Sequence, residues 1–420
     1  MLPADFLIEH ASLIATCAGP APRAGRAQRE IGALENGAIA SHRGVIVYVG
    51  PADRLGAAIE LQSDARRLDA SGCTVVPGFV DAHTHVVFAG DRRAELQRRL
   101  AGATYAEIAA AGGGILNTVA ATRAASEEEL ASQTRARLDR MLACGTTTCE
   151  AKSGYGLTTE SELRQLRVLR ALDAEHAIDV VPTFLGAHEV PPEYRDRRRA
   201  YVDLVVHEMI PRVAAEGLAE WCDVFCEHGV FTPDAAVEIL EAGARAGLKS
   251  RIHADELASS GGCHVAARVN APAADHLIYA DESCADALRA ANTCAVLLPI
   301  ASFYLKLRRF APARMFIDRG VPVALATDMN PGGGFSPSMP FAMSLACCSM
   351  DMTLEEALMA ATLNAAWSLD RAHLVGSLEA GKLMDAVVVD GELTDLLGVG
   401  AHSLRAVVKR GAIVSGKAHA

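Results

Sequence analysis

The sequence predicts an α/β protein with a (β/α)8 TIM-type barrel and a small β-sandwich domain built from both chain termini. Eight apolar stretches recur between residues 75 and 326, and each is followed by a helical segment or a long loop, which is the repeat of such a barrel. The two ends of the chain share a second pattern, short strands separated by turns. We therefore expect a composite β-domain at residues 1–74 and 376–420 and a barrel at residues 75–375.

The residues at the two ends of the chain read as short strands and turns. The clearest N-terminal strand is the β-branched run at 45–49, whereas residues 19–30 are rich in Gly, Pro, Ala and Arg, which predicts a surface loop. The far end has a Val-rich strand at 386–389 and a strand pair around Gly411. We expect the two ends to meet in one sheet.

The middle of the chain alternates between strands and helices. Ser126 and Glu129 have the spacing of a capping box and predict the start of a helix that continues to residue 144. Further helices are expected at 94–100, 233–246 and 354–367. The expected barrel strands lie at residues 75–85, 145–150, 178–185, 222–226, 248–252, 273–277, 294–298 and 321–326. A doubly wound parallel sheet is the alternative architecture. The barrel is favoured because polar residues follow the strand ends, which is where a barrel carries its active site.

Composition excludes several classes of function. The formal net charge of −11 argues against nucleic acid or an anionic membrane surface as the main partner. The 11 cysteines are scattered and form no Cys-x-x-Cys pair, so we expect reduced thiols in a cytoplasmic protein. Residues 1–13 do not have the pattern of a signal peptide, and no apolar run reaches the length of a membrane span. The expected partner is a small-molecule substrate.

A pair of histidines at the end of the first barrel strand suggests a metal site. His83 and His85 are two residues apart, so in a strand both point to the same side. Alone, this pair is also explained by two hydrogen-bonded histidines. However, His253, His276 and Asp328 follow other expected strands, and imidazoles together with a carboxylate suit a zinc-class or iron-class ion. Such an ion lowers the pKa of bound water to roughly 7, which makes hydroxide available at neutral pH.

Several motifs resemble a known family. The run from Pro77 to His85, together with His188, His253, His276 and Thr327-Asp328, resembles the amidohydrolase superfamily, whose members join a barrel to a β-sandwich made from both termini. Within that superfamily, five segments resemble the imidazolonepropionases: residues 88–92, 152–157, 183–188, 253–256 and 327–332. The likeness extends through nearly the whole chain. Lys-Ser-Gly-Tyr-Gly-Leu and Asp-x-Asn-Pro-Gly are far more specific than His-x-His.

The resemblance implies a reaction and a metal. Imidazolonepropionases open the ring of 4-imidazolone-5-propanoate with water to give N-formimidoyl-L-glutamate, in L-histidine degradation. Carried over by motif, His83, His85, His253 and Asp328 are expected to hold one Zn2+ or Fe3+ per subunit. The family likeness also implies a homodimer.

The resemblance also implies substrate contacts. Arg92 is expected to bind the propanoate, since its guanidinium is a fork-shaped cation. The other expected contacts to the ring, substrate or product are Tyr155, His188, Glu256, Asn330, Gly332 and Gly333. Gly333 departs from the Ser or Thr expected of the family, which predicts a lost hydroxyl contact that a backbone N–H could partly replace.

The catalytic roles stay open at the level of sequence. Glu256 or His276 is expected to take the proton of the water, and Asp328 to pass it to the leaving nitrogen. Lys152 is interpreted as a structural residue, the alternative being a carboxylated lysine that bridges two metals. The rival functions are a related deaminase or cyclic amidase acting on another small substrate, and a metal-binding barrel without catalysis.

Overall fold

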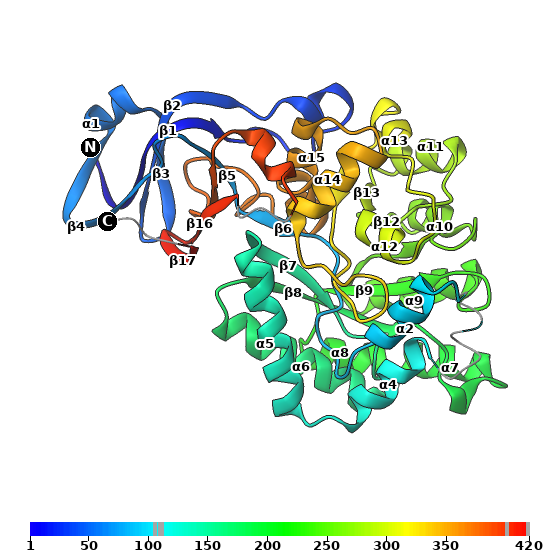
Figure 1. Ribbon diagram of the computed structural model, residues 1–420. Helices are drawn as coiled ribbons and strands as arrows, with labels where there is room; N and C mark the ends of the chain where they lie inside the picture. Colours follow the sequence, from blue (N-terminus) through cyan, green and yellow to red (C-terminus); the bar gives the residue numbers. More distant parts are fainter. Residues whose placement is uncertain (104–106, 108–112, 400–402, 417–420) are drawn as a thin grey trace.

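The protein is described by a computed structural model that covers residues 1–103, 107, 113–399 and 403–416. Two sheets organise the chain (Figure 1): a barrel of parallel strands, and a sheet in which the blue N-terminal strands and the red C-terminal strands lie together. The predicted combination of a (β/α)8 barrel with a terminal β-domain is confirmed. Within the described residues, no helix combines the length and the apolar character needed to cross a bilayer.

The barrel strands occupy the eight predicted positions, the fifth being split into β10 and β11. They run in the order β6, β7, β8, β9, β11, β12, β13 and β14, with β10 paired to β9. A parallel bridge between Thr84 and Met329 joins the ends of β6 and β14 and brings the first and last strands together. The strands are β6 (Phe79–Asp81), β7 (Thr146–Lys152), β8 (Asp179–Ala187), β9 (Trp221–Cys226), β10 (Lys249–Ser250), β11 (His253–Ala254), β12 (Ala273–His276), β13 (Cys294–Leu297) and β14 (Val323–Leu325).

Helices cover the outside of the barrel. The predicted capping box is present: Glu129 N–H donates to Ser126 Oγ at 3.2 Å, and Ser126 N–H donates to Glu129 Oε2 at 3.0 Å. The helices are α2 (Arg93–Leu100), α4 (Ile115–Ala124), α5 (Glu127–Ala143), α6 (Thr159–Glu175), α7 (Arg198–Leu204), the π-helix η4 (Val205–Met209), α8 (Ile210–Ala215), α9 (Pro233–Arg245), α10 (Gly262–Arg268), α11 (Glu282–Ala290), α12 (Pro299–Tyr304), α13 (Ala313–Asp318), α14 (Met339–Ser349), α15 (Leu354–Ala360) and α16 (Leu363–Ser368). The single helix expected at 354–367 is therefore two helices, because Thr362 leaves the helical conformation, with φ −131° and ψ −97°.

The terminal sheet joins the two ends of the chain. Its order is β17, β16, β15, β5, β1, β2 and β3, with β4 paired to β1. Strand β5 lies in this sheet, so the chain enters the barrel at Gly78 rather than at residue 75. A Cβ on Gly78 would lie 2.3 Å from Thr147 Oγ1, so glycine is required at the crossing. The elements are β1 (Leu2–Ala15), β2 (Ala33–His42), β3 (Val45–Pro51), η2 (Ala52–Arg54), α1 (Leu55–Ala58), β4 (Ile59–Asp69), β5 (Cys73–Pro77), β15 (Ala386–Asp390), η5 (Leu393–Leu397), β16 (Leu404–Lys409) and β17 (Ala412–Gly416).

Buried polar contacts attach the terminal sheet to the barrel. Lys409 Nζ donates to Asp385 Oδ2 and to Asp179 Oδ2, both at 2.6 Å, and Asp179 begins strand β8. The prediction of a surface loop at 19–30 is wrong in part. This segment contains the 3-10 helix η1 (Gly25–Arg29), and its Gln28 side chain is buried against β14, where the amide donates to Val323 O at 3.2 Å. These contacts lie at the N-terminal ends of β8 and β14, so the C-terminal strand ends stay available for a site.

Candidate metal centre and active site

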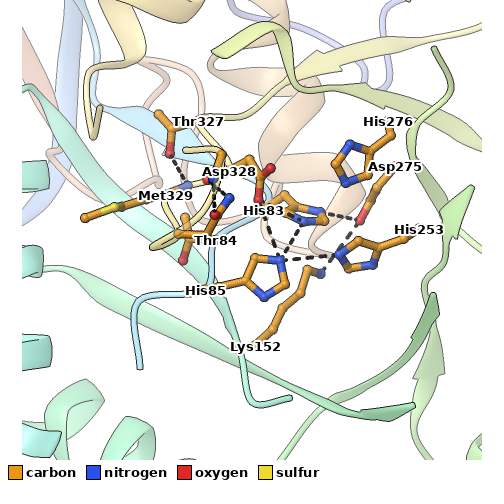
Figure 2. A network of polar contacts seen from close by, with 12 residues as sticks. His83, Thr84, His85, Lys152, His253, Asp275, His276, Thr327, Asp328 and Met329 are labelled. Carbon is orange, nitrogen blue, oxygen red and sulfur yellow. Dashed lines mark hydrogen bonds and ion pairs between the residues drawn. The ribbon is translucent and has the colours of Figure 1, made fainter. Parts of the chain in front are cut away.

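Four predicted ligands converge at the C-terminal end of the barrel (Figure 2). His83 and His85 follow β6, His253 begins β11 and Asp328 follows β14. His85 Nε2 lies 3.2 Å from His83 Nε2 and 3.3 Å from His253 Nε2. Asp328 Oδ1 lies 3.6 Å from both His83 Nε2 and His85 Nε2. The structure therefore brings together side chains from three parts of the chain.

The spacing and chemistry of these donors fit a single metal ion. Four ligands placed tetrahedrally at 2.0–2.2 Å from an ion lie about 3.3–3.6 Å apart, which is close to the four separations given above. The donor atoms of His83, His85 and Asp328 all lie within 4.8 Å of one another. Burial lowers the pKa of His83 and of His85 well below the usual range, so both rings are neutral and present lone pairs. Burial, together with the nearby Glu256 carboxyl group, also raises the pKa of Asp328 well above its usual range.

Two buried carboxylates that sequence reasoning missed orient the histidines. His83 Nδ1 lies 2.7 Å from Asp275 Oδ2, and His253 Nδ1 lies 3.1 Å from Asp223 Oδ2. Because a carboxylate accepts, these contacts place the protons on Nδ1 and leave both Nε2 atoms free for a metal. The only sequence feature that could have indicated these partners is an Asp within each of two strands, Asp223 in β9 and Asp275 in β12.

Lys152 belongs to the same buried network. Its ammonium donates to Glu150 Oε1 at 2.6 Å and lies 2.8 Å from Asp223 Oδ2 and 3.7 Å from Asp275 Oδ2. Figure 2 shows its side chain extending toward His253 and Asp275. Although burial lowers it, the pKa of Lys152 is raised overall by Asp223 and Glu150, so the amine stays protonated. A protonated amine surrounded by carboxylates favours the structural interpretation over a carboxylated lysine.

Glu256 and His276 lie beside the cluster as the candidate proton carriers. His276 Nε2 is 3.7 Å from Glu256 Oε2, and both side chains line the same cavity. Burial raises the pKa of Glu256 to about 7, and burial lowers the pKa of His276 well below its usual range. A carboxyl group that titrates near neutrality can accept and return a proton at the pH of a cell.

A cavity of about 660 Å³ opens above the cluster. Three rings line part of it: the ring of His188 stacks on His85 at 5.0 Å between centroids, and the ring of Tyr155 lies 5.3 Å from that of His188. His83 is fully buried and is not among the lining residues. The other predicted site residues all line the cavity: His85, Arg92, Tyr155, His188, His253, Glu256, His276, Asp328, Asn330, Gly332 and Gly333.

Arg92 is the predicted carboxylate-binding residue, and the structure fixes its position. Its Nε donates to Glu95 Oε2 at 2.8 Å, and Glu95 Oε1 in turn accepts from Gly114 N–H at 2.9 Å. A Cβ on Gly332 would lie 2.2 Å from Arg92 Nη1, so glycine lets the guanidinium pack against the backbone. Sequence reasoning identified Arg92 and Gly332 but missed that the two are in contact and that Glu95 orients the arginine.

The loop after Asp328 is held by Asn330. Its Oδ1 accepts from the backbone N–H of Gly332 and of Gly333, both at 2.7 Å, and its Nδ2 donates to Asp328 O at 2.7 Å. The Gly333 N–H therefore already donates to Asn330, and the expected partial replacement of the missing hydroxyl by a backbone N–H stays a prediction. A Cβ on Gly333 would lie 3.2 Å from Leu305 Cγ, so Leu305 occupies part of the space that a Ser or Thr side chain needs.

Comparisons with known proteins identify the family of the chain. A model of the amidohydrolase family matches residues 74–418. The imidazolonepropionase of Symbiobacterium thermophilum is 48% identical over 419 residues, covering 99% of this chain and 98% of the relative. That of Geobacillus kaustophilus is 48% identical over 414 residues, covering 97% of each. A zinc-bound adenosine deaminase from Xanthomonas campestris shares the fold, with a TM-score of 0.69 at 19% identity, over 98% of this chain and 93% of the deaminase. The chain therefore belongs to the imidazolonepropionase family of amidohydrolases.

Proposed function

We propose that this protein opens the ring of 4-imidazolone-5-propanoate with water and releases N-formimidoyl-L-glutamate, a step in L-histidine degradation. The observation that carries the proposal is that one cavity is lined both by residues of a potential metal-ligand cluster and by Arg92, a cation suited to binding the propanoate. Nearly full-length identity of 48% to proteins named imidazolonepropionase supports the same substrate.

His83, His85, His253 and Asp328 would hold one Zn2+ or Fe3+. When bound, such an ion lowers the pKa of water to roughly 7 and polarises a carbonyl oxygen. Asp275 and Asp223 keep His83 and His253 in the tautomer that binds metal. Three imidazoles and one carboxylate suit either ion, so elemental analysis of the purified protein is the measurement that distinguishes zinc from iron.

The side chains around the cavity supply binding and proton transfer. Arg92 binds the propanoate, and Tyr155 and His188 contact the ring. Water adds to the lactam carbonyl carbon, and the bond from this carbon to the ring nitrogen breaks. The carbonyl becomes the new carboxylate, while the nitrogen leaves with the electron pair and takes one proton. Glu256 or His276 accepts the proton of the water, and Asp328 returns a proton to the nitrogen.

The ultraviolet absorbance of freshly prepared 4-imidazolone-5-propanoate gives the direct test. We expect rapid loss with the protein as purified, no enzymatic loss after chelator treatment, and recovery when Zn2+ or Fe3+ is restored. Mass spectrometry then identifies a product equal to substrate plus one water. A metal-loaded protein that leaves the substrate unchanged would refute the proposal and direct the search to deaminase and cyclic-amide substrates.

We also propose that the protein is a cytoplasmic homodimer. All eleven cysteines are free thiols, which suits a reducing compartment. Light scattering on the purified protein tests the dimer, since a monomer mass across the working concentration range would contradict it. Fractionation of the cells that produce the protein tests the compartment.

A further inference from the structure

The loop that follows α12 carries two exposed cations at the mouth of the catalytic cavity. Lys306 and Arg308 both line that cavity and both are exposed to solvent. Neither matches a motif of the family resemblance. Their position raises the question of what two cations do on the path into the site.

The backbone of this loop is unusual for residues with large side chains. Lys306 has φ +56° and Arg308 has φ +54°, a region that few residues other than glycine adopt. Leu307 N–H donates to Ser302 O at 3.1 Å and Lys306 N–H donates to Phe303 O at 3.1 Å. These bonds end α12 in a Schellman motif, in which glycine is the usual residue at the position of Lys306. Lysine therefore stands at a position where glycine would be less strained.

The two side chains also differ from the other cations near the cavity. Arg92 is paired with Glu95 at 2.8 Å, and the neighbouring Arg309 donates to Ile278 O at 3.0 Å with its guanidinium over the ring of Tyr279. Within the described residues, Lys306 and Arg308 have no carboxylate within 4.0 Å. Two unpaired positive charges at one opening stand out on a chain whose formal net charge is −11.

We propose that Lys306 and Arg308 form an outer carboxylate-attracting site, which selects anionic substrates at the mouth of the cavity and delivers them to Arg92. The inference rests on the proposed function for the identity of the substrate, whose propanoate carries one negative charge. A cleft lined by one sign of charge concentrates the opposite ion. Salt weakens this effect, because the Debye length falls from about 30 Å at 0.01 M to about 3 Å at 1 M.

Binding of a stable analogue tests the proposal without requiring turnover. Imidazole-4-propanoate and its uncharged amide are titrated into the metal-loaded protein by calorimetry, at low and at high ionic strength. The variant is Lys306→Gln with Arg308→Gln. Lys306→Arg with Arg308→Lys keeps both charges and controls for loop structure. Arg309→Gln removes one charge from the same loop but outside the cavity lining.

We expect the double Gln variant to bind the carboxylate about 5-fold more weakly at low ionic strength, with the difference vanishing at about 1 M salt. The amide should bind the variant and the wild type equally. The Lys306→Arg/Arg308→Lys control should bind the carboxylate like the wild type, and Arg309→Gln should weaken carboxylate binding less than the double Gln variant does. Equal weakening of both analogues, or a carboxylate effect that salt does not change, would overturn the proposal. Turnover of 4-imidazolone-5-propanoate by the wild type is measured separately, so failure of the proposed function is distinguished from failure of the outer site.

Discussion

Replacing Asp275 with asparagine tests whether buried carboxylates set the metal affinity. Asp275 Oδ2 lies 2.7 Å from His83 Nδ1, while Arg251 Nη2 donates to its two oxygens at 3.0 and 3.2 Å. Asparagine has a single carbonyl oxygen, so it can accept from only one of these partners and turns its NH2 toward the other. Asp275→Asn therefore removes one charge-assisted hydrogen bond and lets the His83 ring change its tautomer.

The magnitude follows from two independent estimates. A hydrogen bond to a charged group contributes about 1.5–3 kcal/mol. Replacing the outer partner of a metal-bound histidine weakens metal binding about 10- to 100-fold, which is about 1.4–2.8 kcal/mol. The two ranges agree, so we expect Asp275→Asn to bind Zn2+ about 10- to 100-fold more weakly.

Competition with a chromophoric chelator measures this affinity, and circular dichroism with a thermal melt verifies folding. Asp139→Asn is the matched control, because Asp139 makes a similar contact to His176 at 3.1 Å but is exposed, and neither residue lines the cavity. If Asp275→Asn does not fold, Asp223→Asn tests the same reasoning through His253. A folded variant at either position with wild-type Zn2+ affinity would refute the role given to these carboxylates.

Three further predictions concern the ligands, the carboxylate site and pH. His253→Ala should abolish metal retention, and full occupancy by elemental analysis would contradict its assignment as a ligand. Arg92→Ala should raise KM more than it lowers kcat. Gly332→Ala should do the same, because its Cβ would displace the guanidinium, whereas Gly333→Ala should change KM little. An unchanged KM in both Arg92→Ala and Gly332→Ala would remove Arg92 from the carboxylate site. Burial raises the pKa of Glu256 to about 7, and a bound cation would lower this pKa again. We therefore expect kcat/KM to rise with pH through a midpoint between 4.5 and about 7. A Glu256→Gln variant that shows the same rise in kcat/KM with pH would exclude Glu256 as the titrating group.

Much of the fold follows from local sequence. The barrel strands lie where apolar stretches end in polar residues, and the capping box at Ser126 gives the start of α5 because it depends on residues three apart. The less accurate expectations involve partners distant in sequence. Gln28 is buried because it meets the backbone of Val323, and β5 joins the terminal sheet because it pairs with β15. Neither partner is visible from the local pattern.

The sequence by itself predicted most side chains of the candidate site, but not Asp223, Asp275 or Glu95. Strand alternation places His83 and His85 on one side, and residue type makes His253 and Asp328 suitable for binding metal or moving protons. Only the tertiary structure decided how these groups are oriented and charged. His83 and Asp275 are 192 positions apart, and their contact selects the tautomer that leaves Nε2 free. The physical reason is that side-chain chemistry and strand alternation are local properties, whereas hydrogen-bond partners and desolvation depend on which strands the fold brings together.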